Sequence, residues 1–323
     1  MTDMYATDEA TGEGWKLLLG DSCEELARVQ SDSVHLSVYS PPFASLFTYS
    51  NSLRDLGNSA SREEFFAHYA FIIAENLRVT TPGRLAAVHV QNLTTTKATH
   101  GVISMTDFRG EVIRAYQHAG WLFHGEVTVD KDPQAQAIRT KAQALMFQTL
   151  HRDSSMTRPA LADYLLLFRK PGRNPVPIQG DVSNEEWINW ARPAWQAFHD
   201  EITDALLPAT DDSGLILPRS VWYGIREMNT LNARVARDDA DERHICPLQL
   251  DFIERCVRLW SNKGELVLSP FAGIGSEVYT AVKLDRRGLG IELKPSYWRT
   301  AVDNLTQLEH ETLAPPLFEV ASP

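Results

Sequence analysis

The tetrapeptide SPPF directly follows the apolar run VHLSVY and combines residue types that suit the binding of a nucleic-acid base. Its members are Ser40, Pro41, Pro42 and Phe43. Two consecutive prolines hold the backbone extended and lack N–H donors, so the Ser40 hydroxyl and the nearby carbonyls are left as acceptors. Acceptors suit an exocyclic amine, and Phe43 offers an aromatic face for stacking. The alternative interpretation is an ordinary strand followed by a proline turn over a core phenylalanine.

A second segment, LVLSPFAGIGSEVYTAV, passes from an apolar stretch through a tight turn into a helical pattern. Gly273 and Gly275 allow the backbone of this turn to approach a ligand closely. Val278 replaces the third glycine of a dinucleotide fingerprint, and the sequence has no Gly-Lys-Ser/Thr loop, so a pyrophosphate fits poorly. The next strand ends near Glu292, where a carboxylate can accept two hydrogen bonds from ribose hydroxyls. These features predict a nucleoside ligand without a pyrophosphate, such as S-adenosyl-L-methionine; a surface glutamate after a plain strand-turn-helix unit is the alternative.

The elements that would position these two segments alternate between strand and helix patterns. Helical patterns include SCEELARVQ, REEFFAHYAFIIAENLRV and SYWRTAVDNLTQL. Seven strands are expected, at residues 15–19, 34–40, 84–90, 121–129, 163–169, 265–269 and 288–293. This alternation predicts an α/β fold with a mostly parallel seven-stranded sheet and helices on both faces.

Changes in composition divide the chain into five parts. We expect tails at 1–13 and 311–323, a core formed by 14–172 and 243–310, and an insertion at 173–242 that begins with a Pro/Gly-rich connector. Within the insertion, residues 181–242 carry a net charge of −8, which is most of the net charge of −11 of the whole chain.

Composition also excludes several classes of protein. The 323 residues include 31 Lys and Arg against 42 Asp and Glu, so a wholly basic nucleic-acid surface is excluded. The three scattered cysteines, Cys23, Cys246 and Cys256, match neither a disulfide framework nor a zinc site, so we expect no metal and a reducing setting. No basic leader and no run of about 18 apolar residues is present, so we expect no membrane partner.

The order of the two motifs, SPPF before PFAGIGS, resembles the amino-group DNA methyltransferases of the permuted β class. The resemblance covers most of 15–170 and 243–308, and six segments match in order: LLLGDSCEEL, VYSPPF, TTPGRLAAVHV, HICPLQLDFIERCVRLW, LVLSPFAGIGSE and GIELKPSYWRTAVDNL. It implies a circularly permuted, Rossmann-like fold of the S-adenosylmethionine-dependent methyltransferases. Residues 14–172 would then be the catalytic part and 243–310 the cofactor-binding part. SPPFASLFTYSNSLRDLGNS and HICPLQ also resemble orphan methylases of bacteriophages.

The family resemblance assigns roles to individual residues. SPPF would be the catalytic motif, and Ser40, where adenine-modifying relatives usually have Asp or Asn, favours cytosine N4 over adenine N6 without excluding the latter. Asp21 would bind the methionine amino group or a donor on the base, or simply cap the following helix. Ser269 replaces the usual Asp at the start of the cofactor loop, so we expect weaker cofactor affinity. The residues expected to bind S-adenosyl-L-methionine are Asp21, Ser40, Pro270, Phe271, Ala272, Gly273, Gly275, Ser276, Glu292 and His244.

The expected partner is double-stranded DNA, with the target base flipped out of the helix. Residues 131–173 hold eight basic residues against three acidic ones, a pattern that fits phosphate contact or, equally, a solvated face. The residues expected to contact DNA are Lys131, Arg139, Lys141, Arg152 and Arg158. The insertion occupies the place of a target-recognition region, but its acidic surface could instead serve a homodimer.

Three other functions fit the same residues. One is adenine N6 methylation of DNA. Another is methylation of RNA or of a protein amide, although amide-modifying relatives carry Asn-Pro-Pro-Tyr after the cofactor loop and this chain does not. A third is a DNA-binding or assembly protein that kept the fold and lost catalysis. The expected location is the cytoplasm of a bacterial or phage-infected cell.

Overall fold

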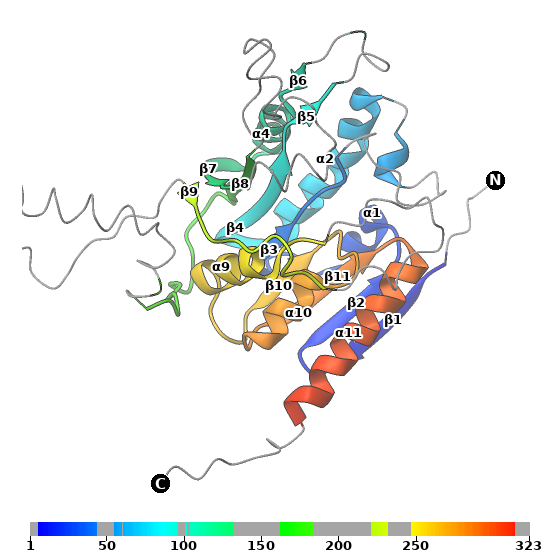
Figure 1. The fold of residues 1–323 in the computed structure, drawn as a ribbon, viewed down its shortest axis with the longest axis vertical. Coiled ribbons are helices and arrows are strands. Elements are labelled where there is room, and N and C mark those ends of the chain that lie inside the picture. The colour runs from blue at the N-terminus through cyan, green and yellow to red at the C-terminus, as the bar shows by residue number, and fades with distance from the viewer. Residues whose placement is uncertain are drawn as a thin grey trace, which may run out of the picture.

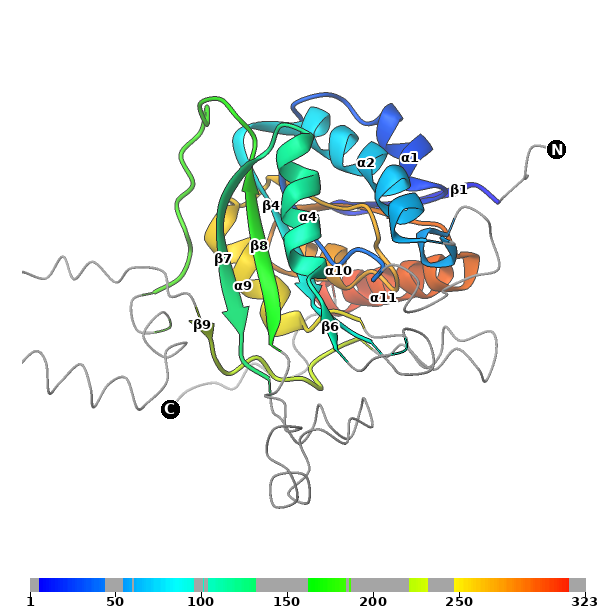
Figure 2. The same cartoon turned by 90° about the horizontal axis from the view of Figure 1, so that it is seen from above.

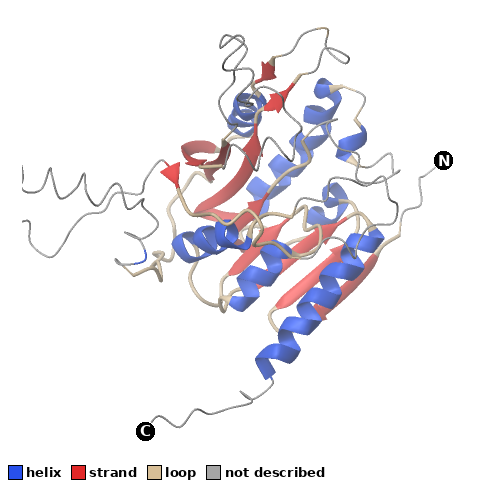
Figure 3. Ribbon diagram, viewed as in Figure 1, coloured by secondary structure: helices blue, strands red, loops and turns tan. Residues whose placement is uncertain are grey.

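The computed structural model describes residues 6–43, 55–59, 61–95, 101, 104–131, 162–183, 186, 221–231 and 247–313. A sheet of nine strands forms the centre of this described part, in the order β1-β2-β11-β10-β3-β4-β8-β7-β9 (Figures 1 and 3). Its strands are β1 (Asp8–Gly12), β2 (Trp15–Leu19), β3 (Val34–Tyr39), β4 (Thr80–Gln91), β7 (Leu122–Val129), β8 (Asp163–Arg169), β9 (Val221–Trp222), β10 (Leu266–Ser269) and β11 (Arg287–Glu292). A separate antiparallel pair consists of β5 (Leu93–Thr94) and β6 (Met105–Thr106).

Five neighbouring strands, β2, β11, β10, β3 and β4, run parallel to one another. Strand β8 is antiparallel to both β4 and β7. Side chains that alternate along a strand enter opposite faces: Ala86 and Val88 pack in one core cluster, whereas Leu85 and Ala87 pack in another. Both faces of the sheet are therefore apolar, and the carboxyl ends of all five parallel strands meet at one edge.

Helices cover both faces of the sheet (Figure 2). One face carries α1, α2 and α4, and the other carries α9, α10 and α11. Their bounds are α1 (Ser22–Glu25), α2 (Arg62–Val79), α4 (Phe108–His118), α9 (Leu250–Trp260), α10 (Ser276–Lys283) and α11 (Pro295–Leu313). Short 3-10 turns occupy Leu26–Arg28 and Leu56–Asn58. None of the helices in the described residues is long and apolar enough to cross a membrane.

The predicted fold class is confirmed, and the seven predicted strands all form, but the prediction of seven strands in total was wrong. The described sheet has two more strands, one at each edge. Asp8–Gly12, expected as part of a tail, pairs antiparallel with β2 through its backbone while most of its residues stay exposed. An edge strand of this kind buries no side-chain face, so its sequence carries no apolar alternation. The other additional strand, β9, comes from the expected insertion.

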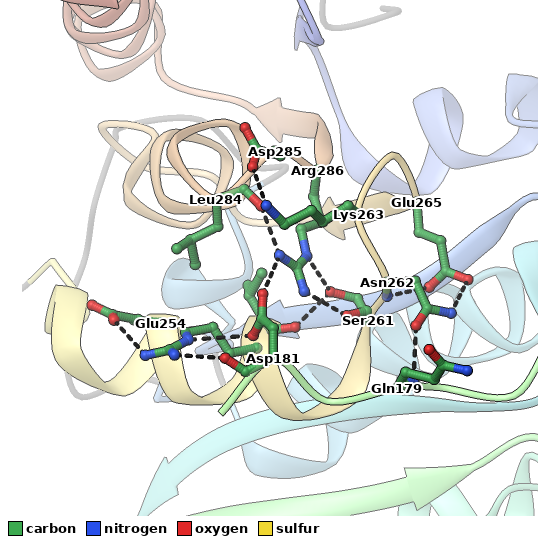
Figure 4. A network of polar contacts seen from close by, with 12 residues as sticks. Gln179, Asp181, Glu254, Ser261, Asn262, Lys263, Glu265, Leu284, Asp285 and Arg286 are labelled. Atoms are coloured by element: carbon green, nitrogen blue, oxygen red, sulfur yellow. Dashed lines mark hydrogen bonds and ion pairs between the residues drawn. The ribbon is translucent and has the colours of Figure 1, made fainter. Parts of the chain in front are cut away.

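The first described residues of the insertion pack against the core (Figure 4). The backbone N–H of Gln179 donates to Asn262 at 2.9 Å, and Arg258 donates to the carbonyl oxygen of Asp181 at 2.7 Å. The buried guanidinium of Arg286 donates to the Asp181 carboxylate at 2.8 Å. These contacts join the connector to α9 and to the turn before β11.

Candidate functional site

A cavity of about 380 Å³ lies at the edge of the sheet where the parallel strands end. Small-molecule sites typically have volumes of about 300–1,000 Å³. Most of the residues predicted to act in catalysis or cofactor binding line this one cavity: Asp21, Ser40, Pro41, Pro42, Phe43, Pro270, Phe271, Ala272, Gly273, Ser276 and Glu292. Gly275 lies in the same loop, and His244 lies outside the described residues.

The parallel strands explain why residues so distant in sequence meet. Asp21 follows β2, Ser40 follows β3, Pro270 follows β10, and Glu292 is the last residue of β11. These four strands are neighbours in the sheet and point the same way. Ligands of open α/β sheets bind at this edge, because the loops that follow adjacent strands diverge there and form a crevice between them.

The glycine loop and Glu292 form one hydrogen-bonded unit. The backbone N–H of Gly273 donates to Glu292 Oε2 at 2.8 Å, and that of Lys294 donates to Oε1 at 2.9 Å. Gly273 and Gly275 have φ angles of 53° and 88°, in the left-handed region that favours glycine. A Cβ atom at Gly275 would also lie 3.0 Å from the Cβ of Ala301. The loop therefore holds the Glu292 carboxyl at the cavity wall.

Burial raises the pKa of Glu292 to about 7, although its two backbone hydrogen bonds act in the opposite direction. A second carboxyl, that of Glu277, also lines the cavity, and burial raises its pKa to about 8, with Glu292 adding to the rise. The sequence prediction missed Glu277, because an acidic residue in the first turn of a helix is ordinary. Asp55 is a second acidic residue of the cavity that the prediction missed.

The residues present fit a polar nucleoside with a positive charge. Acidic side chains line the cavity, and the buried Ser276 hydroxyl has no hydrogen-bond partner among the described residues. A polar ligand could supply that partner, since buried hydroxyls are rarely left unpaired. Ser269, which replaces the usual Asp, also has a buried hydroxyl without a partner in the described chain.

Ser40 and Phe43 both contact His89, which lies on the neighbouring strand β4. The Ser40 Oγ lies 3.1 Å from His89 Nδ1 and 3.2 Å from the His89 carbonyl oxygen. The ring centroid of Phe43 lies 6.3 Å from that of His89 and 6.0 Å, edge-on, from that of Phe108. Sequence reasoning missed His89, whose one signal is a polar residue that interrupts the apolar run RLAAVHV.

Asp21 has the capping role that was predicted as the alternative to binding a ligand. Its carboxylate accepts a hydrogen bond from the backbone N–H of Cys23 at 2.9 Å, and so it caps α1. Asp21 also lines the cavity, so capping does not compete with a second role toward a ligand.

The predicted DNA contacts are mostly outside the described residues, which include none of Arg139, Lys141, Arg152 and Arg158. Lys131 is described, and its side chain is only 7% exposed and lies 2.8 Å from the Asp163 carboxylate. The charge of Lys131 is paired with Asp163 in this structure, and its contact with DNA phosphate stays a prediction. Lys170 is another of the eight basic residues counted in 131–173. It follows β8 at the opposite edge of the sheet, where its Nζ lies 2.6 Å from Asp32 Oδ1.

Comparisons with known proteins identify the family of this chain. A family model described as DNA methylase, N6_N4_Mtase, matches residues 34–303. The type II methyltransferase M.MjaI of Methanocaldococcus jannaschii is 19% identical over 309 residues, which cover 87% of this chain and 88% of that protein. M.Cfr9I of Citrobacter freundii, also a type II methyltransferase, is 23% identical over 298 residues, which cover 90% of this chain and 88% of that protein.

Solved structures show the same fold. PvuII DNA methyltransferase (cytosine-N4-specific) has a TM-score of 0.58 at 16% identity, covering 95% of this chain and 93% of that one. TTHA0409 of Thermus thermophilus has a TM-score of 0.58 at 22% identity, with coverage of 90% and 93%, and it has also been solved with S-adenosyl-L-methionine. Because the family model matches more than half of the chain, the protein belongs to the N6_N4_Mtase family of DNA methylases and is a DNA methyltransferase, cytosine-N4 or adenine-N6 specific.

Proposed function

We propose that this methyltransferase transfers a methyl group directly to cytosine N4 of a base flipped out of double-stranded DNA. The observation that carries the proposal is the single cavity lined both by SPPF and by the glycine loop with Glu292. One cavity that joins a base-binding motif to a nucleoside-binding motif supports direct transfer between two bound ligands. Adenine N6 is the alternative, since both target groups are exocyclic amines.

The glycine loop and the acidic residues would hold the methyl donor. Glu292 would accept hydrogen bonds from the two ribose hydroxyls, because its carboxyl is fixed by backbone donors and faces the cavity. Asp21 would accept from the ammonium of the methionine part. When bound, S-adenosyl-L-methionine supplies a methyl group activated by a positively charged sulfur.

The SPPF motif would hold and orient the base. The Ser40 hydroxyl and the Pro41 carbonyl would accept hydrogen bonds from the amine, which favours a tetrahedral nitrogen and frees its lone pair from the ring. Phe43 would stack on the base, and its contacts with His89 and Phe108 keep its ring in place. No covalent intermediate with the protein is needed, so the rate depends on placing the amine in line with the methyl group.

Ser40 favours cytosine over adenine in this proposal, because the family resemblance links a serine at this position with the cytosine N4 branch. Arg139, Lys141, Arg152 and Arg158 would contact DNA phosphates, since they carry most of the basic charge of the segment before β8. The acidic insertion would serve target recognition or a homodimer rather than phosphate binding.

Paired variants test the two halves of the site. Ser40→Ala should lower the rate of methyl transfer at least about 10-fold. The affinity for S-adenosyl-L-methionine, measured by isothermal titration calorimetry, should stay nearly the same, because in this proposal the Ser40 hydroxyl that is removed contacts the base and not the methyl donor, although Ser40 lines the wall beside both. Glu292→Ala should weaken that affinity by roughly 2 to 4 kcal/mol, since charged hydrogen bonds are lost. Equal losses of rate and affinity in Ser40→Ala would contradict the catalytic assignment, and unchanged affinity in Glu292→Ala would contradict the ribose assignment.

A further inference from the structure

A chain of polar contacts runs from Ser40 through β4 to β8. The Ser40 Oγ lies 3.1 Å from His89 Nδ1, and His89 Nε2 lies 2.9 Å from Asp163 Oδ2. Lys131 Nζ lies 2.8 Å from the same carboxylate oxygen, and Gln91 Nε2 donates to the other oxygen at 2.9 Å. The antiparallel register of β4 and β8 pairs Gln91 with Asp163 and brings the carboxyl beside the His89 ring. His89 and Asp163 are both buried.

The contacts of Asp163 determine which ring nitrogen of His89 carries hydrogen. Burial raises the pKa of the Asp163 carboxyl, but the charges and hydrogen bonds of His89 and Lys131 outweigh burial and hold the pKa below its ordinary value. An ionised carboxylate only accepts hydrogen bonds, so the His89 nitrogen that faces it, Nε2, must be the donor. In a neutral imidazole the other nitrogen, Nδ1, then presents a lone pair to Ser40.

This arrangement fixes the direction of the Ser40 hydrogen bond. Both contacts of the Ser40 hydroxyl, the Nδ1 atom and the carbonyl oxygen of His89, are then acceptors. The single hydroxyl hydrogen is therefore directed at His89, and Ser40 can offer a ligand in the cavity only its lone pairs. A base amine can donate to those lone pairs, whereas a base carbonyl cannot.

We propose that His89, held by Asp163, is a positioning residue that makes Ser40 an acceptor for the target amine and takes up, through Ser40, the proton that the amine loses. The nitrogen forms a bond to the methyl carbon as the methyl–sulfur bond breaks, and the sulfur keeps the electron pair of that bond. One N–H proton then passes to Ser40 Oγ while the hydroxyl proton of Ser40 passes to His89 Nδ1. The imidazolium that results lies against the Asp163 carboxylate. The inference rests on the proposed role of Ser40 in binding the amine.

Nitrogen NMR of the free protein, labelled with ¹⁵N-histidine, tests the hydrogen-bond direction without DNA or methyl donor. At pH 7.5 the His89 signals should show hydrogen on Nε2 and a bare Nδ1, and they are assigned by their loss in His89→Gln. Ser40→Ala should shift the Nδ1 signal, because its hydrogen-bond donor is removed. Hydrogen on Nδ1, or an Nδ1 signal that does not respond to Ser40→Ala, would overturn the inference.

Steady-state kinetics of Asp163→Asn test the role in turnover. The asparagine amide can donate to Nε2, which moves the ring hydrogen to Nδ1 and blocks the contact that Ser40 needs. We expect kcat to fall about 100-fold with KM for DNA and for S-adenosyl-L-methionine nearly unchanged. Gln91→Met is the matched control, because it removes a different hydrogen bond to the same carboxylate, and its kcat should stay within about twofold of wild type. An unchanged kcat in folded Asp163→Asn overturns the inference.

His89→Gln provides a second variant if Asp163→Asn does not fold. Its amide oxygen can accept from Ser40 but cannot take up a proton, so kcat should again fall about 100-fold with little change in either KM; an unchanged kcat would overturn the inference. Failures of the two proposals look different. A wild-type protein that transfers no methyl group to DNA contradicts the proposed function, while the NMR result still decides the direction of the Ser40 bond. Transfer by the wild type together with hydrogen on Nδ1 contradicts the inference alone.

Discussion

Two carboxyl groups, that of the buried Glu277 and that of the half-buried Glu292, line the wall that would face the methyl donor, and each is costly to ionise in the free protein. A ligand with a positive charge and hydroxyl donors offsets that cost, because it pairs with carboxylates that otherwise lack solvation. The pattern SPFAGIGSE predicted the loop and Glu292. It could not predict that Glu277 faces the cavity, since this depends on how α10 packs against β11.

The pH dependence of stability tests the burial of Glu277. Its pKa in the folded protein is raised from 4.5 to about 8, so the folded state holds a proton that the unfolded state releases, and stability falls as the pH rises between these values. Glu277→Gln removes this loss of stability at high pH, because glutamine does not ionise. At pH 8.5 the variant, free of ligand, should melt at least about 2 °C above wild type, whereas at pH 4.5 the two should melt together. Calorimetric scans at both pH values measure this, and a variant less stable than wild type at pH 8.5 would contradict the assignment.

At the scale of elements, apolar runs followed by turn residues were enough to predict the strands that carry the site. Strands β2, β3, β10 and β11 each end in the residue or loop that lines the cavity, as expected from parallel pairing. Edge strands β1 and β9 were not predictable, because β1 is mostly exposed and β9 has only two residues. The contact of His89 with Asp163 also depends on the register of β4 and β8, which lie far apart in sequence.

The anchoring of the connector provides a prediction about stability. Arg286 has a side chain only 1% exposed, and Asp181 is its one carboxylate partner among the described residues. Asp181→Ala should lower the free energy of unfolding by about 2 kcal/mol, because a buried guanidinium loses a charged hydrogen bond. Asp285→Asn is the control: its pair with Lys263 has side chains 66% and 68% exposed, so the loss should stay below about 1 kcal/mol (Figure 4). Urea denaturation measures both, and equal effects would contradict the anchoring role.

For the whole molecule, a net charge of −11 requires that DNA binding rely on a local basic region. The family, the cofactor and the permuted order of motifs were all predictable from short sequence signatures. The DNA-contacting surface stays a prediction, because most of the basic residues assigned to it lie outside the described residues, and basic residues of one segment can lie at opposite edges of the sheet. Lys131 and Lys170 are separated in this way by β8, and each is already paired with an acidic residue.

The salt dependence of DNA binding tests the assignment of Arg139 and Lys141. Reversing both charges, in R139E/K141E, should reduce the slope of log K against log salt by about 2, since each phosphate contact contributes roughly 0.9. Arg173→Glu is the control, because this exposed residue follows β8 at the edge opposite the cavity and should leave the slope unchanged. Fluorescence anisotropy with duplex DNA over a range of salt concentrations gives the slopes. An unaltered slope in the double variant would contradict phosphate contact by this segment.

The most direct test of direct methyl transfer to a base amine is mass spectrometry of nucleosides. Purified protein is incubated with genomic DNA of varied sequence and with S-adenosyl-L-methionine carrying a deuterated methyl group, and the DNA is then digested to nucleosides. We predict deuterated N4-methylcytosine in the wild-type reaction, and its loss in Ser40→Ala. Deuterated N6-methyladenine would contradict the choice of base while leaving the amine chemistry in place. Absence of any labelled nucleoside, from a protein that binds S-adenosyl-L-methionine, would contradict the central claim.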